Sequence, residues 1–194
     1  NFLGTVYNGI DINSFLFNNS PENYYAFLGR MSPEKGPKQA ILAAKKAGVR
    51  LIMAAKIDSV DEEYYHNEVK PLIDGKKIQF IGEIGPKDKN KFLGNAKALI
   101  APIQWEEPFG LYFVEAMATG TPVISIKRGS VPEIIKNEFC GYLASINNDI
   151  DEISEYIKKF EKMDKNNYIQ MRNNSRQHVS NNFSIEKMVD GYEK

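Results

Sequence analysis

Several ingredients are scarce in this chain of 194 residues, and each scarcity excludes a class of protein. With one cysteine, Cys140, the chain forms neither an intrachain disulfide nor a thiolate metal cluster, and nothing indicates an oxidising compartment. The 25 Lys and Arg residues balance 25 Asp and Glu residues, which removes the general electrostatic case for nucleic acid or an anionic membrane as main partner. No apolar run approaches the roughly 20 residues that span a bilayer.

The composition that remains is that of one ordinary globular domain. Hydrophobic residues make up 42% of the chain and charged residues 26%, which excludes a disordered chain. The start, Asn1 to Gly4, has neither an initiator Met nor a basic segment before an apolar core, so it does not predict a signal peptide. We expect a piece of a longer protein, in which residues 1–22 form a linker and entering segment from a missing N-terminal domain.

From about Tyr24 onward, short apolar runs alternate with longer amphipathic segments. The apolar runs predict strands at 24–28, 50–54, 78–81, 98–101 and 122–125. The segments between them predict helices at 37–47, 61–73, 87–96 and 110–119. This alternation is typical of an α/β domain with a Rossmann-like parallel sheet and helices on both faces, which we assign to residues 23–146. Right-handed crossovers would place a ligand crevice at the carboxyl ends of the strands.

The chain changes character after Leu143. Residues 147–194 are rich in Lys, Glu and Asn and predict C-terminal helices at 151–162, 167–179 and 185–192, packed on the same domain. Ser184 is a suitable N-cap for the last of them. Asparagine pairs predict surface turns, with the third pair also compatible with a helix: Asn147-Asn148, Asn166-Asn167, Asn173-Asn174 and Asn181-Asn182.

The most informative stretch runs from Trp105 to Gly120. Glu115 is the single charged residue between Glu107 and Lys127, and it lies in a predicted helix of Leu, Tyr, Phe, Val, Ala and Met. Such a helix is expected to be buried, and a buried carboxylate needs a partner. That partner is either a structural ion pair or the hydroxyl groups of a polyol ligand.

Ahead of Glu115, the break Pro108-Phe109-Gly110 marks the start of this helix. Its first free N–H groups, near Gly110, Leu111 and Tyr112, would face the crevice with the positive end of the helix dipole. A helix start of this kind is a suitable site for phosphate.

A second cluster follows the first predicted strand, between Gly29 and Gly36. Arg30 can bond two phosphate oxygens at once, and Lys35 adds a compact charge. By themselves these are ordinary solvated loop charges. Beside a helix start that follows a later strand, they predict a diphosphate clamp that needs no metal. A glycoside hydrolase is the weaker interpretation, because Glu107 and Glu115 should lie roughly 8–12 Å apart along the helix axis rather than flank one bond.

The motifs, and the order in which they follow one another along the chain, resemble those of the C-terminal, donor-binding half of a GT-B fold retaining glycosyltransferase. The family is the glycosyltransferase group 1 family, which includes glycogen synthases, sucrose synthases and many bacterial mannosyl- and glucosyltransferases. The resemblance covers about residues 5–145, and the end of the chain resembles the family's closing helix. The matching segments are Asn8–Asp11, Gly29-Arg30, Glu34–Gly36, Phe80–Gly82, Glu107–Ile124, Gly129–Glu133, Gly141–Leu143 and Phe183–Tyr192.

The resemblance implies a role for individual residues. Arg30 and Lys35 would hold the donor diphosphate and stabilise it as it departs, Glu107 would contact the transferred sugar, and Glu115 would contact the ribose. With Glu107 these two cations form the implied catalytic set. The other implied donor-binding positions are Gly29, Ile84 near the base, Phe109, Gly110 and Leu111. The chain has Gly129-Ser130 where the family often has two glycines.

The implied function is transfer of a hexose from a UDP-, GDP- or ADP-sugar to a hydroxyl acceptor, with retention and without metal or cofactor. A saccharide or lipid-linked acceptor would bind through the missing domain, so we expect this fragment alone to be inactive. We expect a cytoplasmic enzyme of polysaccharide biosynthesis, with contact to the inner membrane face through that domain as an alternative.

Two other functions stay open, a nucleotide-sugar epimerase of the same fold and a non-catalytic nucleotide-sugar-binding module. A dinucleotide-binding dehydrogenase is disfavoured, because no G-x-G-x-x-G follows the first strand. Asp149-Ile150-Asp151 has the D-x-D pattern of metal-dependent transferases, but capping of a polar helix explains it. His66 and His178 suggest no metal or base role, and Trp105 is interpreted as a packing residue.

Overall fold

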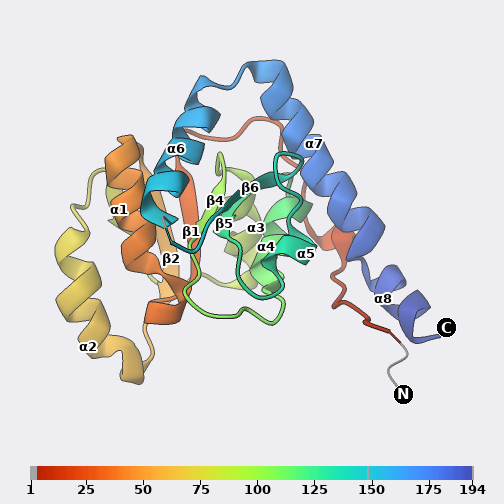
Figure 1. Ribbon diagram of the computed structural model, residues 1–194, viewed down its shortest axis with the longest axis horizontal. Coiled ribbons are helices and arrows are strands. Elements are labelled where there is room, and N and C mark those ends of the chain that lie inside the picture. Colours follow the sequence, from red (N-terminus) through yellow and green to blue (C-terminus); the bar gives the residue numbers. More distant parts are fainter. Residues whose placement is uncertain (1–3, 148, 194) are drawn as a thin grey trace.

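The computed structural model describes residues 4–147 and 149–193, and it contains the predicted parallel α/β sheet (Figure 1). The six strands are all parallel and follow the order β3-β2-β1-β4-β5-β6. They are β1 (Tyr25–Arg30), β2 (Leu51–Lys56), β3 (Ile78–Phe80), β4 (Leu99–Ala101), β5 (Val123–Ile126) and β6 (Gly141–Ala144). The first five confirm the predicted runs. The strand β6 lies where the sequence predicts none, and it pairs with β5 over four residues.

Helices cover both faces of the sheet, as the doubly buried strands require. The helices of the described chain are α1 (Pro37–Ala47), α2 (Glu62–Tyr64), α3 (Pro86–Gly94), α4 (Leu111–Ala118), α5 (Val131–Ile134), α6 (Asp149–Lys162), α7 (Lys165–Asn182) and α8 (Ile185–Tyr192). The side chains of β1 alternate between the two faces: Tyr25 and Phe27 pack on the side of α1 and α6, and Ala26 on the side of α3 and α4. This alternation follows the two-residue period of a strand.

The predicted helix at 61–73 is wrong in detail. The chain there forms a succession of short turns, which are η3 (Ser59–Asp61), α2, the π-turn η4 (Tyr65–Val69) and η5 (Lys70–Leu72). Pro71 lies at the start of η5, where its missing N–H group and fixed φ are tolerated. In the interior of a continuous α-helix, the same proline would remove a hydrogen bond and clash with the preceding turn.

The asparagine pairs at 166–167, 173–174 and 181–182 all lie inside α7. The turns predicted at 166–167 and 181–182 are therefore wrong, whereas the pair at 173–174 lies in a helix, as its alternative interpretation allowed. The helix begins after Asp164, whose side chain accepts hydrogen bonds from the backbone N–H groups of Asn166 and Asn167, each at 3.0 Å. Its buried face carries Met171, Ser175 and Val179, spaced four residues apart. Tertiary packing therefore overrides the weak helix propensity of asparagine. Asn148, of the first pair, lies outside the described residues.

Two arginines of α7 hold the ends of α3 and α4. Arg172 is fully buried and donates to the carbonyl oxygens of Gly94 (2.9 Å) and Ala96 (3.0 Å), at the end of α3. Arg176 donates to the carbonyl oxygen of Ala118, the last residue of α4. These cations lie at the negative ends of two helix dipoles and satisfy carbonyl groups that no helix turn can reach.

The first and last described segments lie side by side. Ile10 forms a β-bridge with Ser184, and α8 begins directly after it (Figure 1). Ser184 caps α8 through a hydrogen bond from the Lys187 backbone, as predicted. Within residues 4–147 and 149–193, no helix is both long enough and apolar enough to cross a membrane.

The buried His178 of α7 predicts a loss of stability in mild acid. Its Nε2 donates to the Ile134 carbonyl oxygen (2.9 Å) and its Nδ1 accepts from the Asn182 amide (3.1 Å), so the neutral ring satisfies both nitrogens. Burial lowers the pKa of His178, so below about pH 6.5 the unfolded chain binds a proton that the folded chain does not. The unfolding free energy should therefore fall as the pH drops below 6.5, by at most about 1.4 kcal/mol per pH unit.

Urea unfolding at pH 7.5 and pH 5.5 measures this effect. The His178→Gln variant should lose less stability than the parent chain between the two pH values, because the titrating group is gone. The exposed His66 provides the control, and His66→Gln should keep the parent's pH dependence. An unchanged loss in the His178 variant would contradict the prediction.

Candidate functional site

The strand order creates a switch point between β1 and β4. From this position the chain crosses to β2 on one side and to β5 on the other, so the loops after β1 and β4 diverge and leave space between them. The two loops touch where Gly36, with φ 69°, packs on the carbonyl of Pro102, and a side chain there would overlap this group. The backbone N–H of Gln104 donates to the carbonyl oxygen of Glu34 (2.7 Å) and fixes the contact.

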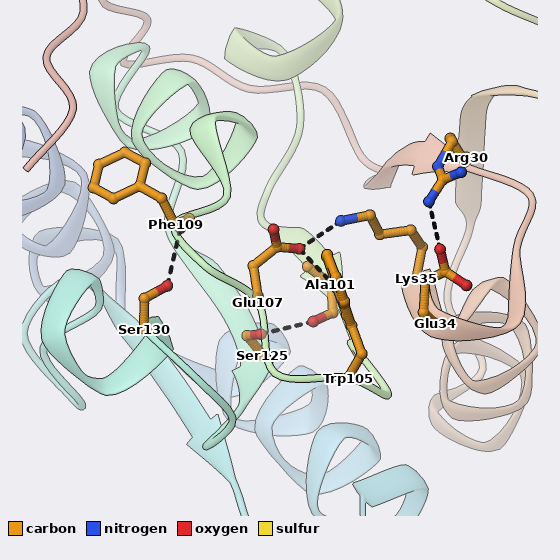
Figure 2. A network of polar contacts seen from close by, with 9 residues as sticks. All are labelled: Arg30, Glu34, Lys35, Ala101, Trp105, Glu107, Phe109, Ser125 and Ser130. Carbon is orange, nitrogen blue, oxygen red and sulfur yellow. Dashed lines mark hydrogen bonds and ion pairs between the residues drawn. The ribbon is translucent and has the colours of Figure 1, made fainter.

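At the switch point, Lys35 from the first loop meets Glu107 from the second (Figure 2). Lys35 Nζ lies 2.5 Å from Glu107 Oε2, and the two side chains are 14% and 7% exposed. Trp105 Nε1 donates to the same oxygen at 3.1 Å, and Lys35 Nζ lies 4.9 Å from the Trp105 ring centre and 5.5 Å from that of Tyr112. Among the described residues, no hydrogen bond reaches Glu107 Oε1, so this oxygen is free to accept one from a ligand.

The loop after β5 holds the backbone around Glu107 in place. Ser130 donates from its backbone N–H to the Glu107 carbonyl oxygen (2.9 Å) and from its hydroxyl to that of Phe109 (3.3 Å; Figure 2). Gly129 N–H donates to Glu106 Oε2 at 2.6 Å. Gly129 has φ 52°, and a Cβ there would lie 2.5 Å from the Glu107 carbonyl oxygen. The backbone therefore approaches closely at Gly129, although serine follows it.

The helix α4 begins at this loop and carries the second carboxylate. Its N-cap, Gly110, has φ 77°, and a Cβ there would lie 2.5 Å from the Phe113 ring. Contrary to prediction, α4 is not buried all round, because Leu111 is 48% exposed. The expected partner of Glu115 is Lys89 of α3, whose Nζ lies 2.5 Å from Glu115 Oε1.

These side chains line a cavity of about 590 Å³. Its lining residues are Asn8, Leu28, Lys35, Lys89, Trp105, Glu107, Pro108, Phe109, Gly110, Leu111, Tyr112 and Glu115. Two lysines and two glutamates face the same space, beside the N-terminal end of α4. Burial, reinforced by the charge of Glu107, raises the pKa of Tyr112 well above its usual value, so its hydroxyl stays protonated.

A second cavity, of about 470 Å³, lies between residues 16–18 and α3. Its asparagine side chains already bond one another or the backbone: Asn18 donates to Asn95 (2.9 Å), and Asn90 donates to the Ser14 carbonyl (2.7 Å). The cavity at the switch point instead combines lysines and glutamates beside a helix start, and it is therefore the candidate site.

Six of the nine site residues predicted from sequence line this cavity: Lys35, Glu107, Phe109, Gly110, Leu111 and Glu115. The Phe109 ring packs against Phe183, 5.8 Å between centres. Gly29 and Ile84 line a smaller neighbouring cavity of about 130 Å³, and Leu28 is common to both.

Arg30 is not among the residues that line either cavity. Its guanidinium pairs with Glu34 four residues later (Figure 2). It also lies 3.8 Å from Asp58. The Arg30 side chain is 43% exposed. The structure therefore brings Lys35 and the two glutamates together and leaves Arg30 at the edge, held by a carboxylate of its own loop.

Of the six lining residues that the sequence analysis did not assign to the site, three contact its lysines or glutamates. Lys89 lies among other lysines in a polar helix, and nothing local distinguishes it from Lys87 or Lys91. Trp105, expected to pack, is 37% exposed and contacts both members of the Lys35 pair. The ring of Tyr112 is the third. A tryptophan two positions before a functional glutamate is a signal that could have been used.

No group of three His, Cys, Asp or Glu side chains within residues 4–147 and 149–193 is placed to hold a metal ion. The D-x-D segment opens α6, as predicted. Asp149 accepts from the Ile150 backbone (2.8 Å) and from Gln104 (2.9 Å), and Asp151 pairs with Lys46 (2.6 Å).

The six-stranded parallel sheet with its C-terminal helices has the fold of one half of GT-B glycosyltransferases. Residues 11–178 match the family described as glycosyl transferases group 1, and the chain belongs to this family.

Three relatives illustrate the likeness. The D-inositol 3-phosphate glycosyltransferase of Corynebacterium efficiens is 31% identical over 127 residues, which cover 61% of this chain and 30% of that protein. HepE of Anabaena, in complex with UDP, superposes with a TM-score of 0.82 at 20% identity, covering 98% of this chain and 56% of HepE. The C-terminal domain of LpcC from Francisella tularensis gives 0.74 at 23% identity, covering 91% of this chain and all of that domain (100%).

At these identities the structural likeness shows the fold. The chain spans between 28% and 52% of the length of the curated relatives that it matches.

Proposed function

We propose that this chain is the donor-binding part of a glycosyltransferase that moves a hexose from a nucleoside diphosphate sugar to a hydroxyl acceptor, with retention of configuration and without a metal or cofactor. The observation that carries the proposal is the pair of Lys–Glu contacts beside the N-terminal end of α4, at the switch point of the sheet. HepE, which shares the fold, has been crystallised with UDP-glucose, which supports a donor of this chemical class.

The donor diphosphate is assigned to the N-terminal end of α4. The free N–H groups of Leu111 and Tyr112 and the helix dipole favour an anion there. Lys35 has three N–H donors, so it can stay bound to Glu107 and still donate to a phosphate oxygen. Positive charge placed beforehand beside the leaving diphosphate stabilises the charge that grows on it in the transition state.

Glu107 is assigned to the transferred sugar. Lys35 and Trp105 both hold its Oε2, and Oε1 remains available to accept a sugar hydroxyl. The carboxylate is nearly buried and its backbone is clamped by Ser130, so its direction is fixed before the donor arrives. Orientation of the sugar by such a fixed group contributes to the rate.

Arg30 is assigned to the diphosphate after it leaves Glu34. An exposed ion pair is typically worth about 0.2–1 kcal/mol, so a doubly charged ligand replaces Glu34 at little cost. Gly29 and Ile84, in the smaller cavity next to the site, are assigned to the nucleoside end, with Ile84 near the base. Phe109, Gly110 and Leu111 shape the space around the diphosphate and sugar.

Glu115 is assigned to the ribose hydroxyls, and this assignment has a direct test. Removing hydrogen bonds to a charged acceptor should weaken binding of every productive nucleotide by about 1–3 kcal/mol, or roughly 5- to 150-fold. Calorimetric titration with UDP, GDP and ADP of the parent chain and of Glu115→Ala measures the difference. Glu155→Ala, at an exposed position of α6, is the control and should bind like the parent.

The two ways this test can fail are distinguishable. A parent chain that binds none of the three nucleotides contradicts the proposed function as a whole. Binding that is unaffected in Glu115→Ala contradicts the ribose assignment alone.

The proposal also covers the acceptor and the cellular location of the whole enzyme. We assign residues 1–22 to an entering segment, 23–146 to the nucleotide-sugar-binding domain and 147–194 to helices packed on it. A preceding domain would bind the saccharide or lipid-linked acceptor. The whole enzyme would act in the cytoplasm, in polysaccharide synthesis. This chain alone would then bind nucleotide and transfer sugar slowly or not at all.

A further inference from the structure

Lys89 is a charged residue of the cavity that none of the sequence motifs includes. It lies in α3, and its Nζ contacts Oε1 of Glu115 in α4 at 2.5 Å. The two side chains are 28% and 15% exposed, so solvent screens the pair only in part. Among the described residues, no hydrogen bond reaches Glu115 Oε2. The contact therefore holds one oxygen of the carboxylate and leaves the other free.

The same arrangement occurs at the other end of the cavity, where Lys35 holds Oε2 of Glu107 and leaves Oε1 free. In both pairs the lysine comes from a different element than the glutamate, and both glutamates flank the start of α4. A lysine that limits the rotation of a carboxylate turns a flexible side chain into a directed acceptor.

The helices that carry the Lys89 pair are fixed relative to each other. Arg172 bonds the carbonyl groups of Gly94 and Ala96 at the end of α3, and Arg176 bonds that of Ala118 at the end of α4. Since both arginines belong to α7, the two helices are anchored to one rigid element. The separation of the backbones that carry Lys89 and Glu115 is then set by the fold.

We infer that Lys89 is a positioning residue that directs the free oxygen of Glu115 toward the ribose hydroxyls, so that it sets the preference for ribonucleotides over deoxyribonucleotides. The inference rests on the proposed function, in which Glu115 contacts the ribose. The anion is assigned to Lys35 and the helix N–H groups, and a direct contact of Lys89 with the diphosphate is the alternative that the test distinguishes.

The test compares binding of UDP and 2′-deoxy-UDP by calorimetry, or the matching guanosine or adenosine pair if the chain prefers that base. The parent should bind the ribonucleotide roughly 10-fold more tightly, because the deoxy ligand lacks a hydrogen bond to a carboxylate. In Lys89→Met this ratio should fall toward about 1, while affinity for the deoxy ligand changes less than about 2-fold. Lys89→Arg should restore most of the ratio, because a guanidinium can also hold Oε1.

The control is Lys91→Met, in the same helix but lining the second cavity, and it should keep both affinities. Lys89→Gln replaces Lys89→Met if the latter does not fold by circular dichroism. Equal weakening of both ligands would overturn the inference and assign Lys89 to the phosphate. An unchanged ratio would overturn it as well. A parent chain that binds no nucleotide would contradict the proposed function itself. Failure of the proposed function can therefore be distinguished from failure of the Lys89 inference.

Discussion

Replacing Lys35 with methionine is expected to lower both the stability of this domain and its affinity for nucleotide. The Lys35 and Glu107 side chains are only 14% and 7% exposed, so the change leaves a nearly buried carboxylate without its cation. Breaking such a pair typically costs about 3–5 kcal/mol of unfolding free energy. Loss of a charged hydrogen bond to the diphosphate should weaken UDP binding by a further 1.5–3 kcal/mol, or roughly 10- to 150-fold. Urea unfolding and calorimetry measure the two effects.

A double variant separates these two consequences. In Lys35→Met with Glu107→Gln no unpaired charge remains, so most of the lost stability should return. Nucleotide affinity should stay low, because the cation that faces the diphosphate is still missing. Lys38→Met is the control, since its pair with Glu68 is exposed and should contribute less than about 1 kcal/mol. A single Lys35 variant as stable as the parent, or a double variant that binds like it, would contradict the prediction.

The second large effect is expected at Arg172, far from the cavity. Its guanidinium is fully buried and donates to three backbone carbonyls, those of Asn18, Gly94 and Ala96, at 2.8–3.0 Å. Arg172→Met removes every donor at once and leaves these acceptors without partners. Each unsatisfied buried group costs about 1–3 kcal/mol, so a total loss of about 3–5 kcal/mol is expected after partial relaxation.

Thermal and urea unfolding check this value. For a domain of this size the loss corresponds to a fall in Tm of roughly 6–20 °C. Arg50→Met serves as the control, because Arg50 makes an exposed hydrogen bond to Gln79 and its loss should change stability by less than about 1 kcal/mol. If Arg172→Met unfolds at the parent's temperature, the guanidinium is not what holds the ends of α3 and the segment around Asn18 in place.

The layered fold was predictable because its signals are local. Each of the first five strands is a short apolar run that ends near a glycine or a polar loop, and the periods of two and 3.6 residues appear within one window of sequence. The helix start at Gly110 is likewise encoded by adjacent residues. The strand β6 was not predicted, because its four residues, Gly141–Ala144, form a strand through their pairing with β5.

The predictions for the interior of α7 and for the segment at 59–72 were wrong for related reasons. Asparagine favours turns in isolation, but the buried face of α7 and the cap at Asp164 keep the helix continuous. Between Ser59 and Leu72 the sequence has helical periodicity, yet Pro71 and the packing of Tyr65 divide it into short turns.

The sequence by itself predicted two carboxylates that line the cavity, because Glu107 precedes a helix start and Glu115 is the single charged residue between Glu107 and Lys127. Only the tertiary structure decided their partners. Lys35 meets Glu107 from 72 positions away, Lys89 meets Glu115 from 26, and Arg30 turns to Glu34 instead of the cavity. Which charged side chains pair depends on how helices and loops pack across the sheet. The spacing of neighbouring residues along the chain does not predict contacts between such distant segments.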